Sequence, residues 1–382
     1  MSAVTIRPIA AEEHLGFLAS RPEANFLQNP HWARVSSWRS QALGIWQGEN
    51  LVGTALVLGK RVPIPERIPV LGRKHFAYIP EGPVIDPAHT SYPAVLPALT
   101  EYLKSTGAFL IRMGLPTVAR RWSAGTIRDA LAAEQARTIP DVEPDHVDEE
   151  ALALQAELIG LGWKDLPISM SLEAGWPQFQ ARIPLASEDG EPLDVDDVLA
   201  GMSSSARKSM RKSARSGVEV TRHGTESLED FYALHLQTAQ RHGFTPRPKE
   251  GVRTLMEALS SSGIAETTIF LASSEGQQLA TSLYVGQGET GHALYAGSSE
   301  QQRKLEAPIF LKLQQIEHLV ENRLRWFNLG GVSPSLERTE PTTGITQFKT
   351  KQGAELMQTL GEWDYAVDPV IAAAYRRYRP RK

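Results

Sequence analysis

The stretch WFNLGGVSPSLERTEPTTGITQFKTKQGAE, residues 326–355, organises the rest of the chain. A strand-like run ends in Gly330 and Gly331, a loop rich in Ser, Pro and Thr follows, and a second short extended run brings Phe348 and Lys349 ahead of another glycine. Paired glycines after a strand let a ligand approach the main chain closely. A lysine between an aromatic residue and a glycine turn can supply a fixed positive charge to an oxyanion. These residues alone leave two interpretations open: a ligand site, or a strand end with a solvated lysine.

The composition indicates a globular protein of two domains. A chain of 382 residues is long enough for two cores, and 41% hydrophobic with 22% charged residues is ordinary for a globular chain. No segment approaches the roughly 18 uninterrupted apolar residues of a membrane span, and no signal peptide opens the chain, so a cytoplasmic location is expected. The lack of cysteine excludes disulfides, thiolate metal sites and cysteine nucleophiles. A net charge of −4 argues against nucleic-acid binding over the whole surface but leaves room for local basic patches.

The order of predicted elements indicates a mixed α/β (α+β) fold. A strand, a helix and a hairpin open the chain, and the same plan returns in the second half after a crossover near Trp176, which suggests two similar modules. Residues 116–150 include one helix and an acidic run, which is typical of a solvated excursion. The predicted elements of the first half are strands at 5–9, 42–46, 51–58 and 108–113 and helices at 11–20, 93–105 and 123–135.

Residues 193–216 predict one long amphipathic helix. At about 100° per residue, Met202, Ala206, Met210 and Ala214 share one stripe. The opposite face could be merely solvated, or it could follow the phosphates of an RNA backbone or a lipid diphosphate, with an affinity that falls steeply with salt. That face carries Arg207, Lys208, Arg211, Lys212 and Arg215.

Several familiar catalytic motifs are absent from the sequence. There is no H-E-x-x-H, no G-x-x-x-x-G-K-[ST] and no G-x-G-x-x-G after a strand, and the ten histidines show no metal-ligand spacing. We therefore expect no metal and no cofactor. The remaining chemistry fits direct attack by an acceptor amine on an already activated ester, which needs positioning and oxyanion stabilisation more than a protein nucleophile.

Several segments together resemble the FemABX family of aminoacyl-tRNA-dependent peptidyltransferases. That family has a glycine pair after a strand and an FK-x-x-x-G-x-E element, which NLGGV and GITQFKTKQGAE match here. Further matches occur in the family's order over most of the chain, and the family's helical-hairpin insertion is missing, so the chain is similar to the compact members. The matches are FLQNPHWA (26–33), YIPEGPVID (78–86), the basic run with SGVEV (216–220), TAQRHGFTPR (238–247) and LYAGSS (294–299).

The resemblance implies a tandem of two GNAT (acyl-CoA N-acyltransferase)-like domains. Residues 1–176, completed by a C-terminal tail at 357–382, would form the precursor-binding domain, and residues 177–356 the aminoacyl-tRNA side. The loop QQRKLEAP (301–308) bears on the acyl donor, because GNAT enzymes that use acetyl-CoA hold its pyrophosphate on the N–H groups of a glycine-containing loop. Here Glu306 and Pro308 occupy the positions of those glycines. The Glu306 carboxylate would repel the pyrophosphate, and Pro308 has no N–H to donate to it.

The resemblance also implies roles for individual residues. Lys349 matches a lysine tied to the aminoacyl end of the tRNA, and Phe348 would shape the same pocket, so both are predicted to be catalytic. The five cations of residues 193–216 are the predicted tRNA-binding residues. Three positions depart from the family pattern, namely Ser36 for a lysine, Gly114 for an aspartate near the acceptor amine, and Gly251 for a tyrosine, so no general base is assigned. The predicted substrate-binding residues are Arg34, Arg39, Tyr78, Arg247, Tyr295, Gly330 and Gly331.

The sequence therefore predicts a tRNA-dependent aminoacyltransferase. It would move an amino acid from aminoacyl-tRNA to the side-chain amine of a peptidoglycan precursor stem peptide. The expected partners are aminoacyl-tRNA and a UDP-MurNAc-peptide or lipid-linked precursor. The protein is expected to be a monomer, in peripheral contact with the inner face of the membrane. Two alternatives stay open: a GNAT-like N-acyltransferase with another acyl donor, and a non-catalytic module that binds the precursor.

Overall fold

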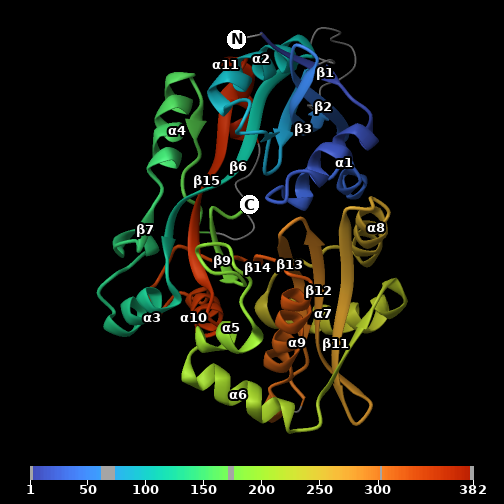
Figure 1. The fold of residues 1–382 in the computed structure, drawn as a ribbon, viewed down its shortest axis with the longest axis vertical. Helices are drawn as coiled ribbons and strands as arrows, with labels where there is room; N and C mark the ends of the chain where they lie inside the picture. The colour runs from blue at the N-terminus through green and yellow to red at the C-terminus, as the bar shows by residue number, and fades with distance from the viewer. Residues whose placement is uncertain (1–2, 62–73, 171–175, 302, 379–382) are drawn as a thin grey trace. The chain divides into compact units, whose positions relative to one another are not determined.

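The computed structural model describes residues 3–61, 74–170, 176–301 and 303–378 (Figure 1). Gln302 of the loop at 301–308 and the end of the predicted tail, residues 379–382, lie outside this description. The chain divides into two compact units. Unit 1 holds Met1–Arg120, His146–Gln178 and Gln358–Lys382, and unit 2 holds Arg121–Asp145 and Phe179–Met357.

Unit 1 is built on a mixed sheet with the strand order β1-β2-β3-β4-β6-β15. The first four strands pair antiparallel, and β4 pairs parallel with β6 through a crossover that contains α2. The strands are β1 (Val4–Pro8), β2 (Arg39–Gln47), β3 (Asn50–Arg61), β4 (His75–Ile79), β5 (Val84–Ile85), β6 (Ala108–Trp122), β7 (His146–Val147), β8 (Lys164–Asp165) and β15 (Glu355–Ala366). The helices are α1 (Ala11–Ala19), α2 (Tyr92–Ser105), α4 (Glu149–Gly160) and α11 (Pro369–Tyr378), with short 3-10 turns η1 (Phe26–Gln28) and η2 (Trp32–Val35).

The core of unit 1 lies between its sheet and α2. Leu96, Leu99 and Leu103 recur at the helical spacing and are buried against the strands. Trp363 of β15 is fully buried in the same core, and its indole Nε1 donates a hydrogen bond to the carbonyl of Leu360 at 3.0 Å. The C-terminal strand is therefore part of the core of unit 1.

Unit 2 is built on six strands in the order β9-β14-β13-β12-β11-β10, with both parallel and antiparallel pairs. Its strands are β9 (Phe179–Pro184), β10 (Glu219–His223), β11 (Ala265–Ser274), β12 (Gln277–Gln287), β13 (Thr290–Ser298) and β14 (Trp326–Gly331). Its helices are α3 (Ala124–Ala133), α5 (Val195–Ala200), α6 (Ser204–Ala214), α7 (Leu228–His242), α8 (Lys249–Ser260), α9 (Ala307–Glu321) and α10 (Thr343–Lys351), with 3-10 turns η3 (Ile139–Asp141), η4 (Thr225–Ser227) and η5 (Arg303–Leu305).

The central strand β12 lies in the core of unit 2. It is buried at every position from Leu279 to its end, and successive side chains point to opposite faces, so both faces of the sheet are covered there. Helices α7 and α9 both pack on β12. The chain then returns through α9 to β14, which pairs parallel with β13 and ends in the glycine pair Gly330 and Gly331.

Three expectations from the sequence need correction. Residues 121–145 belong to unit 2, because Trp122 and Ile127 are buried in its core, whereas the sequence placed them in the first domain. The single helix at 193–216 is two helices, α5 and α6, with Gly201 between them. Of the predicted apolar stripe, Met202, Ala206 and Met210 are buried, but Ala214 is exposed.

Candidate functional site

A lysine ammonium lies at the end of β14 in unit 2. Gly330 adopts a φ of 80°, in the region that favours glycine. The Nζ of Lys349 donates to the carbonyl oxygen of Gly330 at 3.1 Å and to that of Gly331 at 2.7 Å. The structure thus brings together the three residues of the opening stretch that the sequence singled out.

The extended segment predicted for Phe348 and Lys349 is wrong, because both residues lie on helix α10. The helix is held by buried threonines: the hydroxyl of Thr343 donates to the carbonyl of Glu337 at 2.8 Å, and Thr346 is fully buried. Phe348 is 45% exposed at the surface of the helix. A pocket shared by Phe348 and Lys349 therefore stays a prediction.

A second lysine, which sequence reasoning missed, lies near Lys349. Lys312 of α9 places its Nζ 4.5 Å from the centre of the Phe327 ring on β14. The same Nζ donates to Gln315 Oε1 at 2.8 Å, and Gln315 donates in turn to the Ser282 hydroxyl at 3.1 Å. One signal in the sequence could have found it, because a lysine at this position interrupts the apolar face of an amphipathic helix.

The surroundings lower the pKa of both lysines. Desolvation lowers the pKa of Lys349 from 10.5 to about 7. Desolvation, and after it the positive charge of Lys349, lowers the pKa of Lys312 to about 7 as well. An ammonium has three protons to donate, and the two bonds to the glycine carbonyls use two of those on Lys349. Within the described part of the chain, this leaves one N–H of Lys349 for a substrate oxygen.

Arg247 and Tyr295, both predicted to bind substrate, lie in contact in unit 2. The Nε of Arg247 donates to the Tyr295 hydroxyl at 3.0 Å, and the hydroxyl of Tyr232 donates to the carbonyl of Arg247 at 3.1 Å. A Cβ built at Gly251 would lie 3.3 Å from the Cγ of Arg247. The glycine that replaces the expected tyrosine therefore packs directly against the stem of this arginine.

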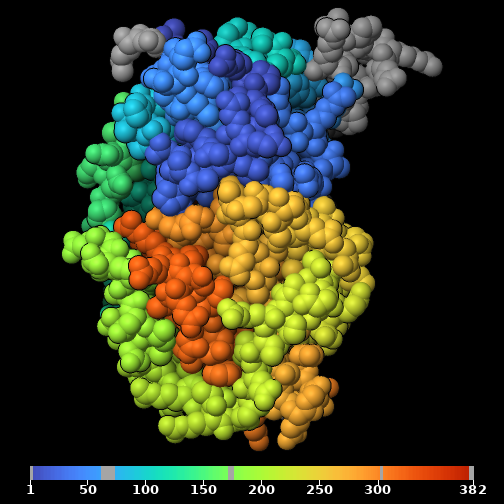
Figure 2. All heavy atoms as spheres, turned by 45° about the vertical axis from the view of Figure 1, so that its right-hand side comes forward, coloured from blue at the N-terminus to red at the C-terminus, as the bar shows by residue number. Residues whose placement is uncertain are grey.

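Helix α6 carries the predicted tRNA-binding residues. The Arg207 guanidinium donates to the carbonyls of Ala200 at 3.0 Å and Met202 at 2.6 Å, so it binds the C-terminal end of α5. In the space-filling view, the yellow-green surface that includes α6 borders the orange surface of α9, against which α6 packs (Figure 2). The four exposed cations of α6 are Lys208, Arg211, Lys212 and Arg215.

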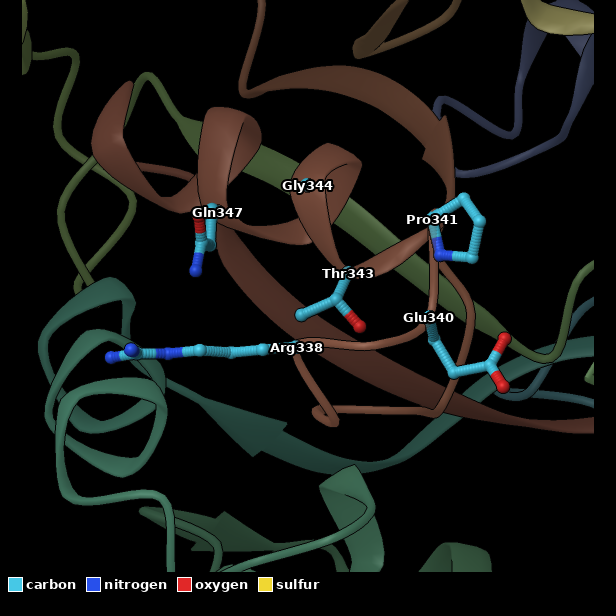
Figure 3. Close-up of a pocket in the computed structure, with 6 residues that line it drawn as sticks. All are labelled: Arg338, Glu340, Pro341, Thr343, Gly344 and Gln347. Atoms are coloured by element: carbon cyan, nitrogen blue, oxygen red, sulfur yellow. The ribbon is translucent and has the colours of Figure 1, made fainter.

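An open hollow of about 460 Å³ lies at the start of α10 (Figure 3). Arg338, on its rim, is ion-paired with Glu134 of unit 2 at 2.6 Å. Gln347, which also lines the hollow, lies two residues before Lys349 on the same helix. The full lining is Arg338, Glu340, Pro341, Thr343, Gly344 and Gln347.

The three predicted substrate-binding residues of unit 1 lie on different elements. Arg34 is on η2, Arg39 begins β2, and both are exposed. Tyr78 is half-buried on β4, where it lies opposite Arg112 of β6, and its hydroxyl bonds to Glu362 of β15. Burial, and after it the charge of Glu362, raises the pKa of Tyr78 well above its usual value.

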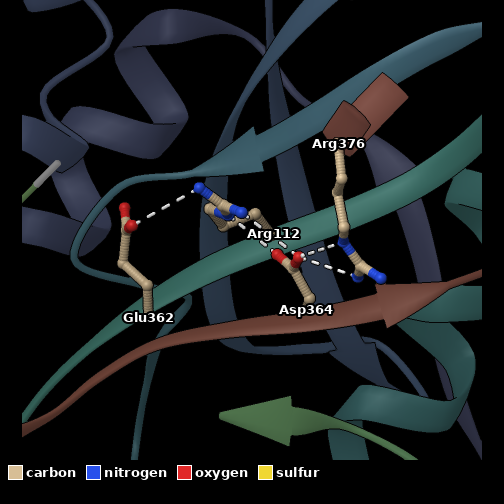
Figure 4. A network of polar contacts seen from close by, with 4 residues as sticks. All are labelled: Arg112, Glu362, Asp364 and Arg376. Atoms are coloured by element: carbon tan, nitrogen blue, oxygen red, sulfur yellow. Dashed lines mark hydrogen bonds and ion pairs between the residues drawn. The ribbon is translucent and has the colours of Figure 1, made fainter. Parts of the chain in front are cut away.

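A charged network surrounds Asp364 in unit 1 (Figure 4), and it includes Arg112, which lies opposite Tyr78 in the strand pairing. The Asp364 carboxylate is 1% exposed and accepts from Arg112 Nε at 2.7 Å and from Arg376 Nη2 at 2.9 Å. Arg112 also lies 3.6 Å from Glu362. Sequence reasoning missed this network, because 252 positions separate Arg112 from Asp364 and no local pattern marks them as partners.

Two of the histidines, His14 and His292, are buried. Burial lowers the pKa of both His14 and His292 to about 4, so these side chains are neutral. In the part of the chain that the structure describes, no group of three or more His, Asp or Glu side chains could hold a metal ion. Among the same residues, no helix is both long enough and apolar enough to cross a membrane.

Comparison with known proteins gives matches along most of the chain. A family model described as the FemAB family matches residues 9–262 and 257–379. The chain is 20% identical to the lipid II:glycine glycyltransferase of Staphylococcus saprophyticus over 98% of this chain and 95% of that protein. It is 21% identical to the lipid II:glycine glycyltransferase of Staphylococcus aureus, with the same coverage of 98% and 95%. These relatives align along nearly their whole length.

Solved structures show the same fold. The crystal structure of FemX aligns with a TM-score of 0.76 and 18% identity over 97% of this chain and 99% of that chain. A tandem GNAT protein from the clavulanic acid biosynthesis pathway aligns with a TM-score of 0.50 and 12% identity over 95% and 98%. The predicted fold class, mixed α/β with two GNAT-like domains in tandem, is confirmed. Because the family model matches most of its residues, this chain belongs to the FemAB family.

Proposed function

We propose that this chain is an aminoacyltransferase that moves an amino acid from aminoacyl-tRNA to the side-chain amine of a peptidoglycan precursor. Relatives named lipid II:glycine glycyltransferases, aligned over nearly their whole length, support a transferase that acts on such a precursor. The single observation that carries the proposal is the Lys349 ammonium held against the carbonyls of Gly330 and Gly331. This arrangement fixes a cation at the end of a strand, where a substrate can approach the main chain.

The reaction requires charge stabilisation more than a protein nucleophile. The acceptor amine attacks the ester carbonyl, a C–N bond forms, and the C–O bond to the tRNA ribose breaks as a proton passes from the amine to the leaving oxygen. Negative charge develops on the carbonyl oxygen during the attack. The third N–H of Lys349 supports this oxygen, which typically contributes about 3–4 kcal/mol. A pKa of about 7 also lets Lys349 exchange a proton readily near neutral pH.

Two further groups of predicted binding residues fit the same reaction. Lys208, Arg211, Lys212 and Arg215 provide an exposed basic surface for the tRNA backbone, while Arg207 supports α5. The Arg247 guanidinium, oriented by Tyr295, suits the diphosphate of the precursor. A lipid-linked precursor would bring the enzyme, as a monomer, to the inner face of the membrane from the cytoplasm.

A transfer assay tests the proposal directly. The purified chain is incubated with tRNAs charged with single amino acids and with either a UDP-linked or a lipid-linked precursor, and the product is weighed by mass spectrometry. The added mass identifies the amino acid, and the precursor that reacts identifies the carrier. Lys349→Met should slow transfer by about 100–1,000-fold. Lys351→Met, an exposed lysine on the same helix, should leave the rate unchanged.

The alternative, a GNAT-like acyltransferase with acetyl-CoA as donor, has weaker support. Glu306 precedes α9 at a φ of 52°, and its carboxylate accepts from Ser209 Oγ at 3.1 Å. A carboxylate at a helix N-terminus repels a pyrophosphate. Micromolar acetyl-CoA binding in calorimetry, together with an acetylated product, would favour this alternative. Precursor binding without transfer from any donor would favour a non-catalytic module.

A further inference from the structure

A strained, buried glutamate lies in the loop after β4 in unit 1. Glu81 is 4% exposed and has a φ of 49°, in the left-handed region that residues other than glycine rarely adopt. Among the described residues, the other non-glycine positions with positive φ are exposed or half-buried, at Glu134, Glu275, Glu306 and Arg323. Strain of this kind persists where the surroundings enforce it, and it concentrates at functional sites. Glu81 is therefore a candidate for a function of its own.

The surroundings of Glu81 form a compact acid cluster. Burial, and after it the charge of Glu362, raises the pKa of Glu81 from 4.5 to about 8. Tyr78 from β4 and Tyr92 from α2 lie within electrostatic range of Glu81, and Tyr92 donates to the carbonyl of Pro83 at 3.2 Å. Glu362 itself contacts Arg112 and the Tyr78 hydroxyl. Near neutral pH, Glu81 therefore keeps a proton beside a second carboxyl group.

A glycine on β6 makes room for this carboxyl group. The amide of Gly82 donates to the carbonyl of Gly114 at 2.8 Å, which holds the loop against the strand. A Cβ built at Gly114 would lie 3.3 Å from the Glu81 amide nitrogen and 3.8 Å from Glu81 Oε1. Gly114 is the position at which the sequence offered no general base. A carboxyl group is present there after all, supplied by the neighbouring loop.

Glu362 is the more accessible carboxyl group of the pair. Glu362, Tyr78 and Arg112 are all half-buried, whereas Glu81 is 4% exposed. Arg112 is held by two hydrogen bonds to Asp364, at 2.7 and 3.1 Å, so its charge is directed mainly to that carboxylate. An incoming positive charge would therefore meet Glu362 first, with Glu81 as the buried partner.

We propose that Glu81 and Glu362 form the site that receives the acceptor amine, with Glu81 as the group that removes its proton. Identifying the amine as the acceptor rests on the proposed function, whereas amine binding itself does not. When an ammonium binds beside Glu362, Glu81 releases its proton to water, because the new positive charge favours the carboxylate. The Glu81 carboxylate then takes one proton from the ammonium nitrogen and leaves a neutral amine with a lone pair. In total, one proton leaves for water and one moves from nitrogen to oxygen.

The acidity of Glu81 suits this task better than that of an ordinary carboxylate. A lysine-type amine has a pKa of about 10.4 and an ordinary glutamate about 4.3, so proton transfer between them is strongly unfavourable. A pKa of about 8 in the free enzyme makes Glu81 a stronger base than an ordinary carboxylate, so the gap in pKa is smaller than for an ordinary glutamate placed beside the same ammonium. A base whose pKa lies near the working pH is the most effective one in general base catalysis.

Proton release on binding tests the amine site without any transfer step. The probe is a muramyl pentapeptide whose third residue is lysine, and the control ligand is the same compound with that amine acetylated. Calorimetry near neutral pH in two buffers of different ionisation heat should show about one proton released with the amine probe and none with the acetylated one. Glu81→Gln should abolish the release. Glu101→Gln, an exposed residue on α2, should leave it unchanged.

The transfer assay supplies a second readout. Glu81→Gln should slow transfer by about 100-fold or more. It should also remove the midpoint near pH 8 from the pH profile of kcat/KM, which reports the pKa values of the free enzyme. Glu362→Gln should shift that midpoint to lower pH, because the like charge is gone, and a purely structural role would not produce such a shift. Since glutamine resembles the protonated Glu81, Glu81→Gln should fold; Glu362→Gln keeps the size of the side chain, and Arg112 keeps its two hydrogen bonds to Asp364.

The outcomes separate this inference from the proposed function. If the wild-type chain releases no proton with the amine probe, or if Glu81→Gln keeps both the release and the pH profile, the amine site is wrong and the aminoacyltransferase can still stand. If the wild-type chain releases the proton but transfers no amino acid from any charged tRNA, the amine site stands and the proposed function falls.

Discussion

Replacing Lys349 by methionine tests whether its ammonium is withdrawn from water. Methionine keeps most of the length of the side chain but removes the donor to the carbonyls of Gly330 and Gly331. Leaving these two acceptors unpaired costs about 1–3 kcal/mol each if both are desolvated. Below neutral pH this loss of stability is offset, because wild-type Lys349 must then carry its positive charge in a desolvated position, whereas methionine carries none.

The magnitude follows from the pKa of Lys349. The unfolded value of 10.5 and the folded value of about 7 differ by about 3.5 units, and each unit corresponds to about 1.36 kcal/mol. Between these values, the unfolded chain holds a proton that the folded chain lacks, so the free energy of unfolding rises with pH by about 1.4 kcal/mol per unit. The total is at most about 5 kcal/mol, and solvent screening of this half-buried side chain reduces it.

Urea unfolding of wild type and Lys349→Met over a range of pH checks this reasoning. The variant should be less stable than wild type by several kcal/mol in alkaline buffer, and as stable or more stable below about pH 7. Lys312 is present in both proteins, but losing the Lys349 charge raises its pKa in the variant, which adds to the pH dependence of the difference with the same sign. Lys351→Met, which replaces an exposed lysine, should show no such difference. A difference between Lys349→Met and wild type that does not change with pH would refute the reasoning.

Two further predictions concern charges on other elements. Asp364→Asn should lower the free energy of unfolding by about 3–5 kcal/mol in urea denaturation, because it leaves Arg112 and Arg376 without their buried carboxylate. The triple variant Lys208→Ala, Arg211→Ala and Arg215→Ala should weaken tRNA binding and reduce the slope of log affinity against log salt in filter-binding assays. Arg207→Ala should instead lower thermal stability, since this guanidinium binds the end of α5; an unchanged salt slope in the triple variant would mean that this face is only solvated.

Much of the fold could be predicted from the sequence because its signals are local. The hairpin of β2 and β3 follows from two alternating runs around a tight turn, and the buried stripe of α6 follows from the helical spacing of Met202, Ala206 and Met210. Helix α10 was missed because its β-branched, Thr-rich sequence favours a strand. The missed signal was the spacing of Thr343, Thr346 and Thr350, all buried on one helical face.

The candidate site could be predicted only where its residues are neighbours in the sequence or matched a family motif. Gly330, Gly331 and Lys349 were found in this way, and Arg247 with Tyr295 through the resemblance. The sequence could not reveal the roles of Lys312, Glu81 and Glu362. These roles depend on charges that the fold brings together from distant segments. From the sequence, a single lysine or glutamate on a predicted helix or strand would be interpreted as a solvated surface residue.

Above about pH 6.5, buried groups of opposite charge should make the stabilities of the two units respond to pH in opposite directions. In unit 1, the folded state keeps the Glu81 proton that the unfolded chain loses, which lowers stability as pH rises from about 4.5 to about 8. The buried His14 of the same unit opposes this fall only between about pH 4 and 6.5. In unit 2, Lys349 and Lys312 lose protons that the unfolded chain keeps, so stability rises as pH goes from about 7 to 10.5. Where these ranges overlap, between about pH 7 and 8, the two slopes have opposite signs, and the two lysines outweigh the single glutamate toward pH 8. The pH response of the whole chain is then smaller than that of unit 2 alone, so a measurement that resolves the units separately shows the buried charges more fully.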